Sequence, residues 1–213
     1  MKRVGILGGM YNPVHDGHLR AAIEARELLG LDEVRLVPCA SPPHREAPAV
    51  SATLRAEMVE AAVADIEVLK LDARELELPP PSYTVRTLES LRAEMPGAEF
   101  VLLLGEDAFR GFHRWHEWQK VAQLARIAVM RRPGNEDLEL PASLAAWLEE
   151  TEVAHERLFD GDAPAVTFCE ITALDISSTR IRELRAANRD PRFLVPDAVL
   201  DIIERENLYK DRN

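Results

Sequence analysis

Residues 2–18 read KRVGILGGMYNPVHDGH, an apolar run followed by paired glycines, a turn with a proline, and two histidines. The apolar run predicts a strand over residues 2–7, and residues 17–29 predict a helix that ends at Gly30. A strand that leads through a glycine turn straight into a helix is typical of an α/β fold. The glycines allow a sharp turn with exposed amides, and the helix start adds partial positive charge, so this segment suits an anion.

The remaining chain continues this alternation of short apolar runs and amphipathic stretches. Five more strands are predicted, over residues 33–38, 67–71, 99–104, 126–130 and 165–171. Because the alternation is typical of βαβ units, we expect an α/β fold with a Rossmann-like open parallel sheet and helices on both faces. Residues 1–213 then form a single domain, whose helical C-terminal part covers about residues 177–213.

Local signals place three more helices in the chain. One follows Ser51, and another covers residues 84–95, with Ser82 and Thr84 as its candidate caps. The last helix begins at Pro196 and is expected to bury the apolar residues Val199, Ile202, Ile203 and Leu208. Residues 133–164 are polar, acidic and weakly patterned, so we expect them at the periphery of the domain.

The composition excludes several classes of protein. With 213 residues and 46% hydrophobic content, the chain can bury one substantial core. No apolar run approaches the ~20 residues of a membrane-spanning helix, so we expect a cytoplasmic protein with no membrane partner. The net charge of −11 argues against binding a nucleic-acid polymer, although a mononucleotide needs only a local positive pocket. Cys39 and Cys169 lack metal-ligand or redox spacing, and we expect reduced core residues.

His15 and His18 are the chemical groups of the first motif. Their spacing brings both imidazoles near one face at the helix start, where they can donate hydrogen bonds to phosphate oxygens. A structural pair or two metal ligands would show the same spacing, although the segment offers no third ligand. The segment contains neither the G-x-G-x-x-G pattern of dinucleotide-binding folds nor the G-K-[ST] of a P-loop.

A second motif, ISSTRIR, occupies residues 176–182 behind the last predicted strand. Hydroxyls and amides at a helix start can bind phosphate, and an arginine one turn further can neutralise the charge of a leaving pyrophosphate. On its own, the motif is equally compatible with an ordinary N-cap at Ser177 or Ser178 and with solvated side chains at Arg180 and Arg182.

Together, G-G-x-[FY]-N-P-x-H-x-G-H and I-S-S-T-x-I-R resemble the two signatures of the nucleotidyltransferase superfamily. The resemblance is closest to the bacterial nicotinate-mononucleotide adenylyltransferases and covers nearly the whole chain. Four intermediate segments follow in the order of that family: PPHR at 42–45, PSYT at 81–84, GED at 105–107 and RWHEW at 114–118. Met10, Tyr11 and Asn12 depart from the commonest family residues, which are Thr or Ser, Phe and Asp, but none of these changes removes a phosphate ligand.

This resemblance implies an enzyme that transfers the adenylyl group of ATP to nicotinate mononucleotide, forming nicotinate adenine dinucleotide and pyrophosphate in NAD biosynthesis. Mg²⁺ would accompany ATP, and no protein residue is expected to ligate a resident metal. Catalysis is assigned to His15, His18 and Arg182. The ATP-binding residues that it implies are Gly8, Gly9, Met10, His15, His18, Asp107, Ser178, Thr179 and Arg182. The acceptor-binding residues are His44, Tyr83, Thr84, Trp115 and Arg132.

The expected acceptor contacts have a physical basis and competing interpretations. Trp115 offers a flat ring for stacking a pyridine, whereas Trp118, three residues on, is more typical of the core. Nicotinamide mononucleotide is an alternative acceptor, and Thr84 and Trp115 disfavour phosphopantetheine. A nucleotide sensor without turnover is the alternative outside the enzyme class, and a homo-oligomer is compatible with the sequence.

Overall fold

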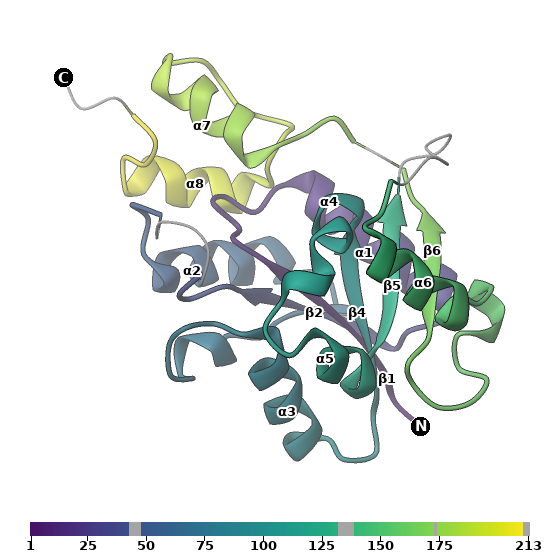
Figure 1. Ribbon diagram of the computed structural model, residues 1–213. Coiled ribbons are helices and arrows are strands. Elements are labelled where there is room, and N and C mark those ends of the chain that lie inside the picture. The colour runs from purple at the N-terminus through teal and green to yellow at the C-terminus, as the bar shows by residue number, and fades with distance from the viewer. Residues whose placement is uncertain (43–47, 132–138, 173, 211–213) are drawn as a thin grey trace.

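The computed structural model describes residues 1–42, 48–131, 139–172 and 174–210. A six-stranded sheet, in which all paired strands are parallel, forms its centre in the order β3-β2-β1-β4-β5-β6 (Figure 1). The strands are β1 (Arg3–Gly9), β2 (Glu33–Pro38), β3 (Leu69–Leu71), β4 (Glu99–Gly105), β5 (Arg126–Arg131) and β6 (Val166–Glu170). All six predicted strands are confirmed, with small shifts at their ends. The strand order reverses between β1 and β4, which is where open parallel sheets bind ligands.

Helices cover both faces of this sheet, as the sequence predicts. The described residues form the α-helices α1 (Asp16–Leu29), α2 (Ala52–Val63), α3 (Thr84–Glu94), α4 (Glu106–Arg110), α5 (Trp118–Leu124), α6 (Ala142–Thr151), α7 (Ser178–Ala186) and α8 (Asp197–Arg205). Short 3₁₀ turns lie between β3 and α3 (η1, Arg74–Leu76), between α4 and α5 (η2, Phe112–Arg114) and between α6 and β6 (η3, His155–Arg157).

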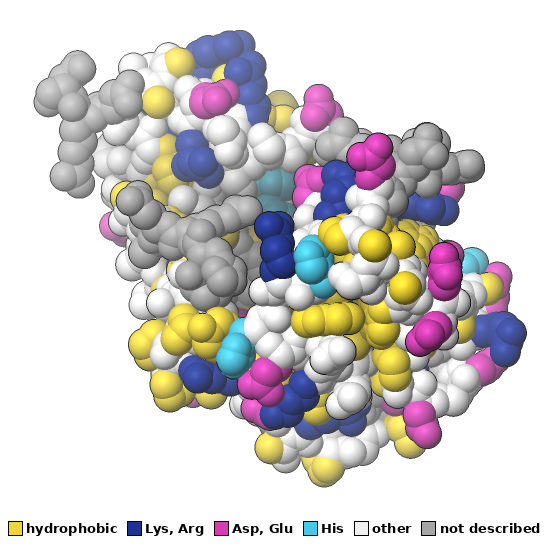
Figure 2. All heavy atoms as spheres, viewed as in Figure 1, with side chains coloured by type: hydrophobic (Ala, Val, Ile, Leu, Met, Phe, Trp, Pro, Cys, Tyr) yellow, Lys and Arg dark blue, Asp and Glu magenta, His cyan; other side chains and the backbone are white. Residues whose placement is uncertain are grey.

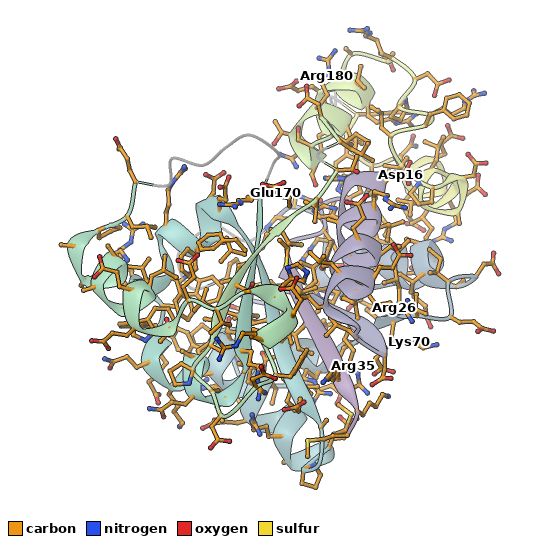
Figure 3. The ribbon with its side chains drawn as sticks, turned by 90° about the vertical axis from the view of Figure 1, so that its right-hand side faces the viewer. Asp16, Arg26, Arg35, Lys70, Glu170 and Arg180 are labelled. Atoms are coloured by element: carbon orange, nitrogen blue, oxygen red, sulfur yellow. The ribbon has the colours of Figure 1, made fainter. Side chains whose placement is uncertain are left out.

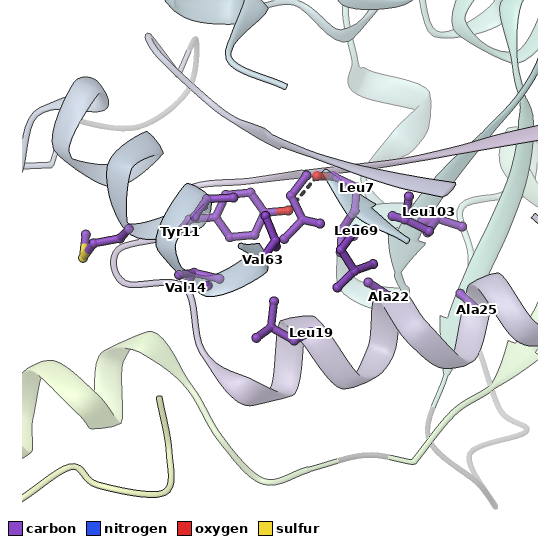
Figure 4. Packing of buried hydrophobic residues seen from close by; sticks show 14 of the residues in the cluster. Leu7, Tyr11, Val14, Leu19, Ala22, Ala25, Val63, Leu69 and Leu103 are labelled. Atoms are coloured by element: carbon purple, nitrogen blue, oxygen red, sulfur yellow. Dashed lines mark hydrogen bonds between the residues drawn. The ribbon is translucent and has the colours of Figure 1, made fainter. Parts of the chain in front are cut away.

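Alternate residues along the strands divide the core into two clusters. In β4, Phe100 and Leu102 pack with α3 and α5, whereas Val101 and Leu103 pack with α1, α2 and α8. Figure 4 shows the second cluster, in which Ala22 and Ala25 of α1 face Leu103. Period-two alternation with both faces buried is the pattern that a doubly covered parallel sheet requires.

The helix ends confirm some predicted signals and correct one. Gly30 ends α1 in the left-handed conformation, with φ of 59°, and Ser51 caps α2 by accepting a hydrogen bond from the nitrogen of Leu54. The residue that precedes α3 is Tyr83, so neither Ser82 nor Thr84 caps this helix. The hydroxyl of Ser82 instead accepts a hydrogen bond from the nitrogen of Ser41, because the loop after β2 lies alongside.

The C-terminal end of α8 also differs slightly from the prediction. The helix begins at Asp197, one residue after the predicted start at Pro196, which is the N-cap, and Val199, Ile202 and Ile203 are buried as expected. Leu208 lies beyond the helix end but still packs, partly buried, against the core.

The described part of the weakly patterned segment is less peripheral than its polarity indicates. Leu144 of α6 is fully buried, and Trp147 packs edge-to-face on Trp118, with ring centroids 5.3 Å apart. Leu158 is 1% exposed. The prediction failed because three apolar residues of α6, at helical spacing, were outweighed by the charged residues around them; residues 133–138 of this segment lie outside the described part.

Both cysteines are free. Cys169 is buried in the core, as predicted, whereas Cys39 is only partly buried. Within the described residues, no helix combines the length and apolar character that crossing a bilayer requires.

Candidate active site

A pocket of about 300 Å³ opens at the carboxyl ends of β1, β4, β5 and β6, beside the start of α1. Figure 2 shows histidine side chains recessed in a hollow of this surface. The pocket is lined by Leu7, His15, Gly17, His18, Ala21, Gly105, Glu106, Asp107, Met130, Arg131, Ile171, Thr172, Leu174 and Ile176. It therefore lies at the reversal of strand order and contains both histidines of the first motif.

His15 and His18 form a stacked pair at the start of α1. Their ring centroids are 3.7 Å apart, and His15 is only 6% exposed. The backbone nitrogen of His15 donates a hydrogen bond to Nδ1 of His18 over 3.2 Å. Because Nδ1 accepts, the neutral His18 ring carries its proton on Nε2 and is a hydrogen-bond donor at that atom.

Burial keeps both rings uncharged in the nucleotide-free protein. Desolvation lowers the pKa of His15 to about 4. The pKa of His18 is lowered to about 3 by desolvation and, secondarily, by the neighbouring His15. Two neutral donors that can gain a proton beside an anion are well suited to phosphate oxygens.

Gly17 provides the space for this pair, and Gly9 provides the space for the turn. A Cβ at Gly17 would lie 3.1 Å from the ring of His15, and one at Gly9 would lie 3.0 Å from the ring of Tyr11. Tyr11 has φ of 44°, is buried, and donates its hydroxyl hydrogen to the oxygen of Leu7 over 2.6 Å (Figure 4). The turn therefore folds around the Tyr11 ring.

The backbone at the ends of two central strands is open to a ligand. A Cβ at Gly8, in β1, or at Gly105, at the end of β4, would meet no atom within 4 Å. Asp107 follows Gly105 in the first turn of α4, with a side chain that is 98% exposed and within 3.0 Å of Arg110. It lines the pocket and does not cap the helix, whose N-cap is Gly105.

The second motif lies directly against the turn of the first. Arg182 donates from Nη1 to the backbone oxygen of Asn12 over 2.9 Å, and from Nη2 to the hydroxyl of Thr179 over 3.1 Å. The hydroxyl of Ser178 donates to the backbone oxygen of Pro13 over 2.8 Å. The two sequence signatures are thus joined in space, although Arg182, Ser178 and Thr179 do not line the pocket itself.

Two further positions of this region settle alternatives that the sequence leaves open. Ser177, not Ser178, is the N-cap of α7 and accepts a hydrogen bond from the nitrogen of Arg180. The Arg180 side chain is exposed (Figure 3), and its guanidinium pairs with Glu183 of the same helix. Asp16, at the start of α1, lies beside the C-terminal helices, and its nitrogen donates to the oxygen of Leu194.

The expected acceptor residues gather in a second region, outside the pocket lining. Tyr83 stacks on His116, with centroids 4.2 Å apart, and Thr84 begins α3 directly behind it. Trp115 is partly exposed and packs edge-to-face on Phe112. Trp118 packs against aromatic rings of the core, as expected. His44 and Arg132 lie outside the described residues.

Sequence reasoning did not find the apolar walls of the pocket or the residue that holds its loops. The walls come from strand ends and from residues 171–176, and local pattern does not separate such residues from the core. Arg55 of α2 is 1% exposed and binds the backbone of the first turn. Its only sequence signal is a charge on an apolar helix face. Among the described residues, no group of three or more His, Cys, Asp or Glu could hold a metal ion.

Comparison with known proteins identifies the family of this chain. Residues 6–184 match the family described as Cytidylyltransferase-like. The chain belongs to this family.

Full-length relatives give a closer match. The protein of Pseudomonas putida strain GB-1 that is named "Probable nicotinate-nucleotide adenylyltransferase" is 47% identical, over all of this chain and 97% of its own. A protein of the same name from Pseudomonas aeruginosa strain UCBPP-PA14 is 48% identical, over 98% of each chain. The nicotinic acid mononucleotide adenylyltransferase of Plasmodium falciparum, solved in complex with NaAD, is 19% identical and covers 98% of each chain with a TM-score of 0.70, which confirms the Rossmann-like fold.

Proposed function

We propose that this protein transfers the adenylyl group of ATP to nicotinate mononucleotide, releasing pyrophosphate, as a nucleotidyltransferase of NAD biosynthesis. The observation that carries this proposal is the junction of residues 8–18 with residues 176–182 beside a pocket that contains both histidines. The two Pseudomonas relatives, both named "Probable nicotinate-nucleotide adenylyltransferase", support the choice of acceptor. We also propose that the protein is cytoplasmic. The proposed function is compatible with a homo-oligomer.

The reaction needs no nucleophile from the protein. A phosphate oxygen of the acceptor forms a bond to the α-phosphorus of ATP, and the bond from that phosphorus to the β-bridging oxygen breaks, so pyrophosphate leaves with the electron pair. The protein's contribution is orientation of the two phosphates and stabilisation of charge on the transferring and leaving oxygens.

The ATP side of this site uses the residues around the first turn. His15 and His18 would donate hydrogen bonds to the phosphates, and the open backbone at Gly8 would allow the nucleotide to approach closely. The amides of Gly9 and Met10 would add donors, and Asp107, exposed in the pocket, would accept hydrogen bonds from ribose hydroxyls. The phosphates would then lie at the N-terminus of α1, where the backbone amides and the helix dipole favour an anion.

The leaving pyrophosphate would be held by the second motif. Arg182 uses two of its donors on Asn12 and Thr179, and a guanidinium has five, so donors remain for phosphate oxygens. Ser178 and Thr179, in the first turn of α7, would add their amides and hydroxyls. The bond from Arg182 to Asn12 would keep this charge next to the triphosphate.

The acceptor would bind at the start of α3 and the segment before α5. Thr84 and the backbone near Tyr83 would receive the nicotinate carboxylate at a helix N-terminus, and Trp115 would stack on the ring. His44 and Arg132, which lie outside the described residues, would supply further contacts to the acceptor.

The chemistry of the donor set fits magnesium that enters with ATP. Mg²⁺ keeps several waters and is bound mostly through substrate phosphates with one or two carboxylates. Since Asp107 is assigned to the ribose, the ion would be held by the phosphates of ATP and by water. The ion would neutralise charge on the triphosphate.

Pyrophosphate release from ATP and magnesium, with nicotinate mononucleotide and nicotinamide mononucleotide assayed in parallel, tests this function. A strong preference for the acid is the expected result. Equal or reversed rates would overturn the acceptor, and the absence of pyrophosphate with either would overturn the adenylyl transfer.

A further inference from the structure

Arg55 is a charged side chain in the apolar interior. It lies on α2, on the same buried face as Met58 and Val59, and is 1% exposed. Among the described residues, its hydrogen-bond partners are three backbone oxygens, and no carboxylate forms an ion pair with it. Desolvation lowers the pKa of its guanidinium. A buried cation without a close counter-ion is expensive for stability, so an apolar side chain of similar length would serve packing better.

The three oxygens belong to segments that meet at the proposed site. Nη1 of Arg55 donates to the oxygen of Met10 over 2.6 Å, and Nη2 donates to the oxygen of Cys39 over 2.7 Å. Nε donates to the oxygen of Val50, just before α2, over 3.3 Å. One rigid, planar group therefore connects the turn after β1 with the loop after β2.

This loop continues the connection to the acceptor side. The nitrogen of Ser82 donates to the oxygen of Ser41 over 2.9 Å, and the nitrogen of Ser41 donates to the hydroxyl of Ser82 over 3.0 Å. Ser82 lies two residues before Thr84, the first residue of α3. Short hydrogen bonds thus link Met10 to Cys39 through Arg55, and Ser41, two residues further along the same loop, to Ser82 before α3.

We infer that Arg55 is a positioning residue of the proposed reaction, whose guanidinium fixes the ATP-binding turn relative to the acceptor-binding start of α3. It touches neither substrate. In-line transfer requires the attacking oxygen of the acceptor phosphate to be held about 3 Å from the α-phosphorus of ATP, and a small misplacement of either atom lowers the rate. The inference rests on the proposed function, because it assigns the two segments to the two substrates.

Arg55→Lys and Arg55→Met test this role. Lysine keeps the charge but concentrates its donors on one atom, so it does not reproduce the planar fork between Met10 and Cys39. Methionine keeps the length and removes both charge and donors. Arg205→Met is the matched control, because Arg205 also contacts α2, through Glu57 over 2.7 Å, but is an exposed residue of α8.

We expect Arg55→Lys to lower kcat on the order of tenfold and to raise the KM of both substrates, with Arg205→Met unchanged. Hydrogen exchange should become faster in residues 8–14 and 36–42 while residues 99–105 keep their protection. Unchanged kinetics, a rise in one KM alone, or faster exchange throughout the protein would overturn the positioning role. The exchange result does not depend on turnover, so it also separates a failure of this inference from a failure of the proposed function.

Ser82→Ala tests the same connection if the Arg55 variants do not fold. It removes the hydroxyl that accepts a hydrogen bond from the nitrogen of Ser41 and that also contacts the side chains of Glu75 and Cys39, while it leaves the bonds of Arg55 in place. The expected result is a higher KM for the acceptor and faster exchange in residues 36–42, with residues 8–14 unaffected. An unchanged acceptor KM would overturn the proposed connection.

Discussion

The guanidinium of Arg182 donates a hydrogen bond from Nη1 to the backbone oxygen of Asn12 over 2.9 Å, across 170 positions of the chain. This bond places the positive charge of the second motif against the turn of the first. It also fixes the Asn12 peptide, whose side chain accepts a further hydrogen bond from the hydroxyl of Tyr209 over 2.7 Å.

Replacing Arg182 with methionine should lower kcat/KM for ATP by about a hundredfold or more, because the leaving pyrophosphate loses a charged donor. Steady-state kinetics with varied ATP measure this effect. Arg180→Met is the control from the same helix, because Arg180 is exposed and paired with Glu183. Near-normal turnover of the Arg182 variant would contradict the assigned role.

ATP binding should take up protons and become tighter as the pH falls below neutrality. His15 and His18 are neutral in the free protein, with pKa values of about 4 and about 3, and phosphate beside them favours the charged rings. Binding therefore raises these pKa values, and protons are taken up between the free and bound values. Calorimetry of ATP binding in two buffers with different ionisation enthalpies measures the uptake.

His18→Gln separates this proton uptake from the titration of ATP itself. On binding ATP, the variant should take up fewer protons than the natural protein at every pH between 5 and 7. Because one imidazole is lost, the difference should be at most about one proton. Equal uptake by both proteins would show that His18 does not meet the phosphates. Since the folded-state pKa values lie below the ordinary 6.5, nucleotide-free protein should also lose stability as the pH falls from 6.5 towards 4.

Alanine at the two adjacent glycines of the first turn should affect different properties: Gly9→Ala the stability of the protein, and Gly8→Ala the binding of ATP. Gly9→Ala places a methyl group 3.0 Å from the Tyr11 ring, which should cost about 1–3 kcal/mol of unfolding free energy. Gly8→Ala meets no atom within 4 Å, so it should leave stability unchanged and weaken ATP binding. Denaturant titration and ATP titration of both variants test the contrast. Equal losses of stability in the two variants would mean that Gly8 is needed for packing and does not leave space for the nucleotide.

Alanine at Trp115 and at Trp118 should separate binding from packing. Trp115→Ala removes the proposed stacking surface and should raise the KM of the acceptor on the order of tenfold, with the KM of ATP unchanged. Trp118→Ala removes contacts with Phe112 and Trp147 and should lower the unfolding free energy by about 2 kcal/mol or more. Acceptor kinetics and thermal denaturation distinguish the two outcomes. A Trp115 variant with a normal acceptor KM would remove that residue from the site.

Local pattern was sufficient for the strands and most helices because burial on a sheet face leaves a periodic apolar signal. The same reasoning undervalued α6, where the apolar stretch that contains Leu144 and Trp147 is flanked by acidic residues on both sides. It also assigned Ser82 to a cap, although its hydroxyl binds the nitrogen of Ser41. A side chain that binds a distant backbone group leaves no periodic signal.

The same distinction applies to the site. His15, His18 and Asp107 could be located from sequence because each follows a strand end, where parallel sheets place their ligands. The contacts of Arg182 with Asn12 and of Arg55 with Met10 could not be predicted, since their acceptors are backbone oxygens far away in the sequence. Such contacts follow from the fold and not from residue type.

The bonds that Arg182 and Tyr209 make to Asn12 have a consequence for biosynthesis. During translation, residue 12 leaves the ribosome long before residues 182 and 209, which are 170 and 197 positions later. Contacts between such distant positions form late and are intrinsically slow. A nascent chain that already contains both histidines therefore lacks the supports of their turn, and the ability to capture nucleotide should arise only after residue 209 has left the ribosome.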